Sequence, residues 1–275
     1  MDLIVFDLDG TLLNKASTLS SFTRETLSLL AEQGIGYTIA TGRTLNDCHD
    51  ILDQSRFFLP QAYKNGVVIW NPDHEHYSHT TFLTLGEIQA VVEAAMSHDL
   101  SPFLFTVEAV HSHRVYHPPL TSAIELQLAD LFRSRRGLEV RPVSELPADA
   151  EISNISALGD PHAVEAIEAL VSASPGLVAY AGVALEGQHL KWIDVHHEDA
   201  SKGNAVTLLR HELGAERVLC FGDSDNDLSM FQIADEAYAP SNAKAELKAA
   251  ATAVIGDHDA DGVARFLRER FNLSS

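Results

Sequence analysis

Two carboxylates that are two residues apart, Asp7 and Asp9, follow the apolar run 3–6 near the start of the chain. This run has the length and composition of a short buried strand, and Gly10 ends it. In open α/β sheets, ligands bind at the carboxyl ends of the strands. Because side chains alternate along an extended chain, Asp7 and Asp9 can point to the same side. Two adjacent carboxylates repel each other, so we expect a bound cation or a shared proton between them.

Three further segments place polar residues at the ends of strands or the starts of helices. Thr41-Gly42-Arg43 follows a strand expected over residues 36–40, and its glycine lets a backbone N–H approach an anion. Ser201-Lys202-Gly203 begins a helix, where the ammonium and the helix dipole both favour an anion. The third segment follows the apolar strand 218–221, and its three carboxylates suit a hard cation with oxygen ligands: Gly222-Asp223-Ser224-Asp225-Asn226-Asp227.

Each of these residues also has an ordinary explanation when it is taken alone. Asp7 and Asp9 then form a turn that caps a strand, Thr41 is a turn hydroxyl, and Lys202 is a solvated surface charge. Two specific alternatives fail. A calcium loop over 223–234 would need Gly at position 228 and Glu at position 234, and the chain has Leu and Ala there. A dinucleotide site would need G-x-G-x-x-G after the first strand, which is absent.

Composition limits both the class of protein and its partners. The chain has 275 residues, a hydrophobic content of 45% and a formal net charge of −20, which fits one large or two ordinary globular domains. The charge argues against nucleic acid and an anionic membrane surface as partners. An anionic substrate would need a metal, Lys or Arg to make its site positive. Two cysteines and no apolar stretch of 18 residues predict a cytoplasmic protein without a signal peptide or membrane span.

Strand and helix patterns alternate at both ends of the chain. Near the N-terminus they predict strand 3–6, helix 22–33 and strand 36–40, and after Ser201 a helix is followed by strand 217–221. Such βα alternation indicates an α/β fold, with a parallel sheet covered by helices.

The middle of the chain has a different order. A helix that begins with a capping box at Thr84 and Glu87 is followed by the pattern strand-strand-helix-strand-helix-strand-strand. This order indicates an inserted α+β module. We therefore expect a catalytic core formed by residues 1–81 and 189–275, with an α+β cap formed by residues 82–188.

Together, the four polar segments resemble the four motifs of the haloacid dehalogenase (HAD) superfamily, in their usual order. The separation of Arg43 from Lys202 is similar to that of the Cof-type subfamily, whose large α+β cap lies between motifs II and III. Asn65-Gly66, Asn242-Ala243 and Asp261-Gly262-Val263-Ala264 also look like that subfamily. The resemblance covers the whole core and, less specifically, the cap, and it implies a Rossmann-like core.

The resemblance implies a role for each matched residue. Asp7 is the nucleophile that forms an aspartyl-phosphate. Asp9 is the general acid for the leaving oxygen and then the base for water. Thr41 holds a phosphoryl oxygen, and Lys202 neutralises charge between nucleophile and phosphate.

The same resemblance implies a Mg²⁺ cofactor and a phosphate site. Asp7, the main-chain carbonyl of Asp9 and Asp223 hold the metal, and Asp227 supports the metal or Lys202. The residues expected to bind the phosphate group are Leu8, Thr41, Gly42, Arg43, Lys202 and Asn226.

The expected function is that of a Mg²⁺-dependent phosphatase acting on a small phosphorylated metabolite, such as a sugar phosphate, a nucleotide or a cofactor phosphate. A phosphomutase and a non-catalytic phosphometabolite-binding protein stay open as alternatives. Asp9 argues against a dehalogenase, whose members lack it. The sequence does not choose the substrate, nor does it decide between a monomer and a homodimer. Candidates for contacts with the leaving group are His111, His113, Arg114 and Lys191.

Overall fold

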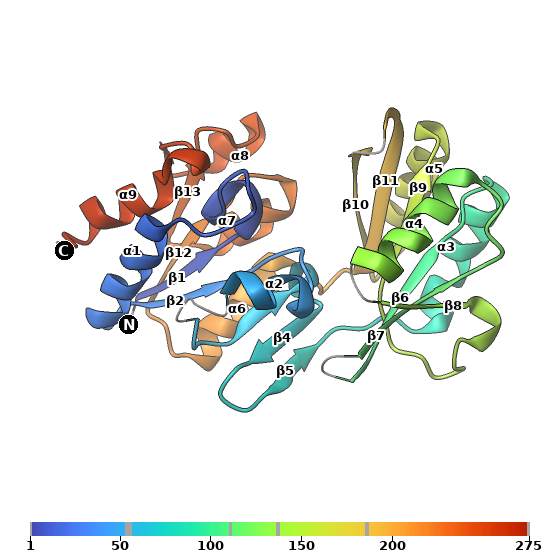
Figure 1. Ribbon diagram of the computed structural model, residues 1–275, viewed down its shortest axis with the longest axis horizontal. Coiled ribbons are helices and arrows are strands. Elements are labelled where there is room, and N and C mark those ends of the chain that lie inside the picture. The colour runs from blue at the N-terminus through green and yellow to red at the C-terminus, as the bar shows by residue number, and fades with distance from the viewer. Residues whose placement is uncertain (1, 53–56, 110–111, 136–137, 185–186, 274–275) are drawn as a thin grey trace. The chain divides into compact units, whose positions relative to one another are not determined.

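The computed structural model describes residues 2–52, 57–109, 112–135, 138–184 and 187–273. The chain divides into two compact units (Figure 1). We call Met1–Thr80 with Ala200–Ser275 the core unit, and Thr81–Asp199 the inserted unit. Among the described residues, no helix has both the length and the apolar character needed to cross a membrane.

In the described part of the core unit, five parallel strands form one sheet in the order β14-β13-β12-β1-β2. Phe6 at the end of β1 pairs with Phe221 on one side and Ile39 on the other, so the carboxyl ends of three strands meet at one edge. The strands are β1 (Asp2–Phe6), β2 (Gly36–Ile39), β12 (Arg217–Phe221), β13 (Glu236–Pro240) and β14 (Ala253–Ile255).

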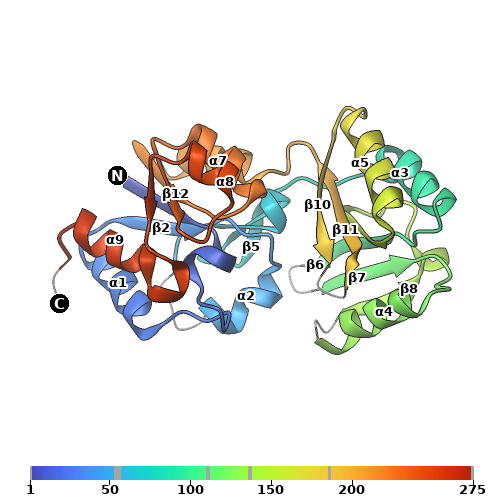
Figure 2. The ribbon, with the colours of Figure 1, turned by 90° about the horizontal axis from the view of Figure 1, so that it is seen from above.

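Helices cover both faces of this sheet (Figure 2). On one face, Leu3 and Val5 of β1 pack with buried residues of α6 (Lys202–Glu212), α7 (Leu228–Ile233) and α8 (Ala245–Ala250). On the other face lie α1 (Ser21–Glu32) and α9 (Gly262–Arg270), and the ring of Phe266 in α9 lies 6.0 Å from that of Phe221. Burial on both faces explains why β1 and β12 are continuous apolar runs.

Smaller elements complete the core unit. Ala40 pairs with Ala62 and so links β2 to an antiparallel sheet. Asn65-Gly66 lies in the turn η2 between two of its strands. These elements are α2 (Leu45–Leu52), β3 (Gln61–Tyr63), β4 (Val68–Asn71), β5 (His76–Thr80), and the turns η1 (Leu8–Leu12), η2 (Lys64–Gly66), η4 (Asp225–Asp227) and η5 (His258–Ala260).

The inserted unit contains, within its described ranges, a six-stranded sheet in the order β10-β11-β9-β6-β7-β8. Its strands are β6 (Phe103–Ala109), β7 (Ser112–His117), β8 (Glu139–Pro142), β9 (Ile152–Gly159), β10 (Leu177–Ala184) and β11 (Gly187–His197).

The helices of the inserted unit divide between the two faces of its sheet. The helices α3 (Leu85–Ser97) and α5 (Pro161–Ser172) pack on one face, and α4 (Ala123–Arg135) packs on the other (Figure 2). The predicted capping box at Thr84 and Glu87 is confirmed at the start of α3. The turn η3 (Val143–Glu145) follows β8.

The second boundary between the units differs from the prediction. Residues 189–199 were expected in the core, but β11 pairs antiparallel with both β9 and β10, so these residues belong to the inserted unit. The apolar pattern of β11 identifies a strand but does not say which sheet it joins. The short strands β5 and β8 were not predicted, because neither has a buried residue and each leaves only a weak apolar signal.

Candidate active site

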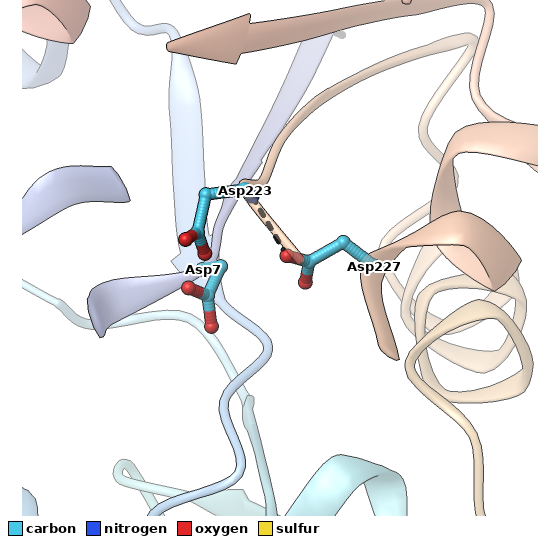
Figure 3. A group of neighbouring side chains, drawn as sticks. All are labelled: Asp7, Asp223 and Asp227. Atoms are coloured by element: carbon cyan, nitrogen blue, oxygen red, sulfur yellow. Dashed lines mark hydrogen bonds between the residues drawn. The ribbon is translucent and has the colours of Figure 1, made fainter. Parts of the chain in front are cut away.

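Three segments of the core unit bring ionisable groups together at the carboxyl edge of the parallel sheet. Asp7 directly follows β1, and its N–H donates to the carbonyl of Phe221 at 2.8 Å. Asp223 and Asp227 lie in the loop after β12, and Figure 3 shows their carboxylates beside that of Asp7. Lys202 is the first residue of α6.

Lys202 is the centre of a buried ion cluster. Its Nζ donates to Asp7 Oδ1 at 2.5 Å and to Asp227 Oδ1 at 2.6 Å. Lys202 and Asp227 are 0% exposed, and Asp7 is 5% exposed. Taking such charges out of water is tolerated only when they are paired and hydrogen-bonded. This lysine is therefore a fixed part of the site, not the solvated charge that its sequence position alone allows.

Asp227 connects this cluster to the backbone of the loop after β12. Its Oδ2 accepts the N–H groups of Asp223 at 2.8 Å and Ser224 at 3.0 Å, the first of which Figure 3 draws. Its Oδ1 accepts the hydrogen bond from Lys202 Nζ. Both oxygens are thus engaged within the fold, which fits the support of Lys202 and of the loop better than direct coordination of a metal.

The pKa values of the cluster reflect its burial and the charges of its own members. Burial raises the pKa of Asp7 to about 8, and Asp227 adds to this effect while Lys202 opposes it. Burial and then Asp227 raise the pKa of Asp223 to about 6. Burial alone would lower the pKa of Lys202, but Asp227 and Asp7 outweigh it and raise that pKa. The site therefore carries more negative charge than its lysine can balance.

The donor set fits a divalent hard cation. Asp7, Asp223 and Asp227 each offer a carboxylate oxygen, and these atoms lie within 4.8 Å of one another. When all three carboxylates are ionised, they carry three negative charges. The ammonium of Lys202 balances one of these charges, so two remain uncompensated. Oxygen ligands and a charge of two are what Mg²⁺ requires. Asp7 and Asp223 are the better ligands, since Asp227 is engaged elsewhere.

Asp9 lies in η1 with a side chain that is 54% exposed. The guanidinium of Arg43 holds it bidentately, with Nε donating to Oδ2 at 2.7 Å and Nη2 donating to Oδ1 at 2.6 Å. The pKa of Arg43 is raised, chiefly by this bond. Arg43, expected at the phosphate, is therefore a partner of Asp9 in this conformation. That pair could not be predicted from local patterns, because the two residues are 34 positions apart along the chain.

Two of the remaining phosphate-site candidates, Thr41 and Asn226, are connected through hydrogen bonds. Thr41 is buried, and its Oγ1 accepts the N–H of Arg43 at 3.2 Å. Asn226 donates to Asn65 Oδ1 at 2.9 Å, and the N–H of Asn65 donates to the Thr41 carbonyl at 2.9 Å. Asn65 thus links Asn226 to Thr41.

The structure limits what the other two candidates can contribute. The side chain of Leu8 is fully buried, so its main chain alone is available to an anion. A Cβ at Gly42 would lie 3.3 Å from Asn65 Oδ1, which places this glycine beside the Asn65 link.

Asp225 does not join the carboxylate cluster, although its spacing from Asp223 and Asp227 suggested that it would. It forms an ion pair with Lys244 at 2.5 Å, and both side chains are at least half exposed. The reason is η4, since a helical turn over Asp225–Asp227 sends alternate residues to different sides.

Two residues that shape the site were missed as functional residues. Gly10 has a φ of +72°, and a Cβ there would collide with the carboxylate of Asp223, so glycine satisfies both the backbone and the space. Asn242 donates to the Gly10 carbonyl at 2.8 Å and so fixes η1. The signals that were available are a glycine directly after a carboxylate and the Asn242-Ala243 pair.

Of the leaving-group candidates in the inserted unit, His111 lies outside the described residues. His113 is buried. Arg114 forms an ion pair with Glu139, and Lys191 pairs with Glu165 at 2.7 Å.

Sequence comparison identifies relatives along the whole chain. A family model described as haloacid dehalogenase-like hydrolase matches residues 4–267. A 5-amino-6-(5-phospho-D-ribitylamino)uracil phosphatase of Bacillus subtilis, YitU, is 28% identical, with 98% of each chain covered. A pyridoxal phosphate phosphatase of Escherichia coli, YbhA, is 24% identical, with 96% of each chain covered.

Solved structures share the fold. A phosphatase of the haloalkanoate (HAD) superfamily from Bacteroides thetaiotaomicron has a TM-score of 0.81 at 22% identity, over 100% of this chain and 96% of that one. A sugar phosphatase of HAD subclass IIB has a TM-score of 0.78 at 20% identity, with both chains fully covered. The resemblance predicted from the four motifs is thus confirmed: the chain belongs to the haloacid dehalogenase-like hydrolases, and the named relatives that match its full length are phosphatases.

Proposed function

We propose that this hydrolase is a Mg²⁺-dependent phosphatase that cleaves a small phosphorylated metabolite through an aspartyl-phosphate on Asp7. The observation that carries the proposal is the buried cluster of Asp7, Lys202 and Asp227, with a half-exposed carboxylate, Asp9, two residues away. One carboxylate is fixed and paired, as a nucleophile requires, and the other is accessible, as a proton carrier requires.

The reaction has two steps. In the first, a carboxylate oxygen of Asp7 bonds to phosphorus, the bond from phosphorus to the ester oxygen breaks, and Asp9 gives that oxygen its proton. In the second, Asp9 takes a proton from water, the water oxygen bonds to phosphorus, and the bond to Asp7 breaks. Phosphate leaves, and Asp7 and Asp9 return to their starting states.

The other residues of the site hold charge and position. Lys202 Nζ, 2.5 Å from Asp7 Oδ1, is placed to balance the negative charge that the phosphoryl group brings. Thr41, Asn226 and the main chain of residues 8–9 would bind the phosphoryl oxygens. Phosphoryl transfer depends chiefly on such positioning and electrostatic stabilisation.

Mg²⁺ would be held by Asp7, Asp223 and the main-chain carbonyl of Asp9, with Asp227 supporting the set through Lys202 and the loop N–H groups. When bound, it would neutralise the charge of the phosphoryl group and orient it towards Asp7.

For the substrate, we propose a small phosphorylated metabolite whose identity is read by the inserted unit. Supporting this division, the residues matched to the four motifs all lie in the core unit. The relatives act on an aminouracil ribityl phosphate and on pyridoxal phosphate, so the range includes cofactor phosphates. Both cysteines are free and buried, which is compatible with the reducing cytoplasm that we propose as the location.

The test is phosphate release from p-nitrophenyl phosphate and from a panel of phosphorylated metabolites, with the wild-type chain and Asp7→Asn. We expect turnover by the wild type in the presence of Mg²⁺ and none by the variant. Asp225→Asn is the matched control, since it removes a carboxylate from the same loop that pairs only with exposed Lys244. Equal turnover by the wild type and Asp7→Asn would exclude the proposed nucleophile.

The same assay separates the alternatives. A phosphomutase would convert a sugar phosphate into its isomer when supplied with the bisphosphate, with little free phosphate. A phosphometabolite-binding protein would bind its ligand without turnover by any variant. Release of free phosphate that tracks substrate loss one to one supports the phosphatase.

A further inference from the structure

The inserted unit contains a pocket of its own, with a volume of about 230 Å³. It lies on the face of the sheet that carries α4, between that helix and the strands β6, β9 and β11. The side chains that matter to the argument are Phe103, Phe105, Phe132, Trp192, Ser156 and Asp194.

The walls of this pocket are aromatic. The ring of Phe132 in α4 meets the rings of Phe103 and Phe105 edge to face, at centroid distances of 5.3 and 5.2 Å. The indole of Trp192 lies over Gly182 of β10, where a Cβ would be 3.1 Å from the ring. The absence of a side chain at position 182 therefore makes room for the indole. Trp192 is 37% exposed, so part of its indole is accessible to a ligand.

One edge of the pocket is polar and negatively charged. Asp194 Oδ1 accepts hydrogen bonds from Ser156 Oγ and, at 3.3 Å, from Asn154 Nδ2. Both donors are neutral, and no lysine, arginine or histidine of the described ranges forms an ion pair with Asp194. Lys191 of the same strand pairs instead with Glu165 of α5, on the other face of the sheet. A carboxylate held in place beside apolar walls, without a cation, suits a ligand that brings an amino group or another N–H donor.

The volume shows which group the pocket can take. A cavity of about 150 Å³ is enough for benzene, so about 230 Å³ has room for one six-membered ring with its substituents. Aromatic walls favour a flat ring and also attract a cation held near their faces.

We propose that this pocket binds a single aromatic ring that carries an amino or N–H group directed at Asp194, and that this ring is the non-phosphate part of the substrate. The inference rests on the proposed function, because it takes the ring as part of the compound that is dephosphorylated. It narrows the substrate class to ring-bearing amino compounds, as opposed to plain sugar phosphates.

Binding can be measured without turnover. The chain has two tryptophans, so Trp70→Phe leaves Trp192 as the fluorescent reporter. We expect benzylamine to change the fluorescence of Trp192 saturably. Benzyl alcohol, which lacks the amine, and cyclohexylmethylamine, which lacks the aromatic ring, should each bind at least about tenfold more weakly. Equal binding of all three probes, or no binding of benzylamine, would overturn the proposal.

Variants then locate the site. Asp194→Asn keeps the shape of the side chain and removes its charge. We expect this variant to bind benzylamine about tenfold more weakly, or weaker still. Asp130→Asn is the matched control, because Asp130 is an exposed residue of α4 that pairs with Arg133. Gly182→Ala gives a second test, since it displaces the indole without touching the carboxylate. Unchanged affinity in both Asp194→Asn and Gly182→Ala would show that the probe binds elsewhere.

Turnover connects the pocket to the substrate. We expect the wild type to prefer para-(aminomethyl)benzyl phosphate to benzyl phosphate by about tenfold in kcat/KM, and Asp194→Asn to abolish the preference while Asp130→Asn keeps it. Phosphate release with the same ratio in all three proteins overturns the assignment of the ring and leaves the phosphatase intact. No phosphate release by the wild type from any ester is a different result, which overturns the proposed function itself.

Discussion

The two units of this chain each hold a carboxylate in a partly apolar setting, and they treat it differently. In the core unit, Asp7 is 5% exposed and has the ammonium of Lys202 at 2.5 Å. In the inserted unit, the side-chain donors to Asp194 among the described residues are a hydroxyl and an amide. The ammonium of Lys202 offsets part of the first charge, whereas the second bonds to neutral groups, and we propose that a ligand balances it. This difference suits a site with fixed chemistry and a separate site with variable recognition.

The geometry of each sheet explains the contrast. In the core unit, parallel strands and the start of α6 bring residues from distant parts of the chain to one edge. In the inserted unit, Asn154, Ser156 and Asp194 are neighbours on one face of adjacent antiparallel strands, where one substitution changes the pocket and little else.

Asp7→Asn is the strongest test of the contrast between the core unit and the inserted unit. We expect kcat for p-nitrophenyl phosphate to fall on the order of 10⁴-fold or more, because the amide cannot act as the nucleophile. Thermal unfolding followed by circular dichroism should show that the variant is folded. A fall of less than about tenfold would mean that the chemistry does not depend on this carboxylate.

Removal of the metal should have the next largest effect. With EDTA we expect a loss on the order of 10³-fold, since a divalent cation stabilises the transition state by several kcal/mol. Mg²⁺ should restore activity and Ca²⁺ should not, because its longer bonds misplace the phosphoryl group. Full activity after exhaustive chelation would contradict the assignment.

The pH dependence of the Mg²⁺ requirement tests whether Asp7 and Asp223 hold the metal. The pKa values of Asp7 and Asp223 are raised to about 8 and about 6, so both carboxyls take up protons as the pH falls through these values. Protons then compete with the metal, and the Mg²⁺ concentration for half-maximal activity should rise by about tenfold per pH unit for each proton displaced. A constant requirement between about pH 8 and about pH 6 would contradict this.

Lys202→Met tests whether the charge in the core is balanced from within. The variant keeps the length of the side chain but leaves Asp7 and Asp227 buried without their cation. We expect the free energy of unfolding to fall by about 3–5 kcal/mol in the presence of EDTA, measured by urea denaturation. Lys244→Met, which breaks an exposed pair with Asp225, should cost about 0–1 kcal/mol. Similar losses in the two variants would show that burial does not distinguish them.

Arg43→Lys should have the smallest effect. A lysine keeps the charge but cannot hold Asp9 with the two parallel bonds of 2.7 and 2.6 Å. If Arg43 positions Asp9, we expect kcat to fall about tenfold, with a change in the pH profile of kcat and little change in KM. A rise in KM at constant kcat would instead assign Arg43 to phosphate binding.

Much of the core could be predicted because its signals are local. The apolar run before Asp7, the helix start at Lys202 and the strand before Asp223 each identify an element and the end at which it carries a polar group. Once parallel strands are inferred, their carboxyl ends must meet, so the gathering of these side chains follows.

What the sequence could not supply depends on contacts between distant segments. The pattern of β11 is that of a half-buried strand in either unit, and only its pairing with β9 decides the boundary. The bond between Arg43 and Asp9 joins residues 34 positions apart. Asp225 has the spacing of a ligand, but the turn η4 directs it to Lys244.

The inserted unit is one uninterrupted stretch, Thr81–Asp199, whose start is closed by a pair of hydrogen bonds between Leu83 and Ile152. If the inserted unit reads the substrate, as we propose, exchange of this one segment would replace the recognition residues together and leave Asp7, Lys202 and Asp223 unaltered. Point mutations in the core put the chemistry at risk, whereas recombination of this segment does not. A lineage with this architecture can thus acquire new substrates by exchanging a cassette, without passing through inactive ancestors.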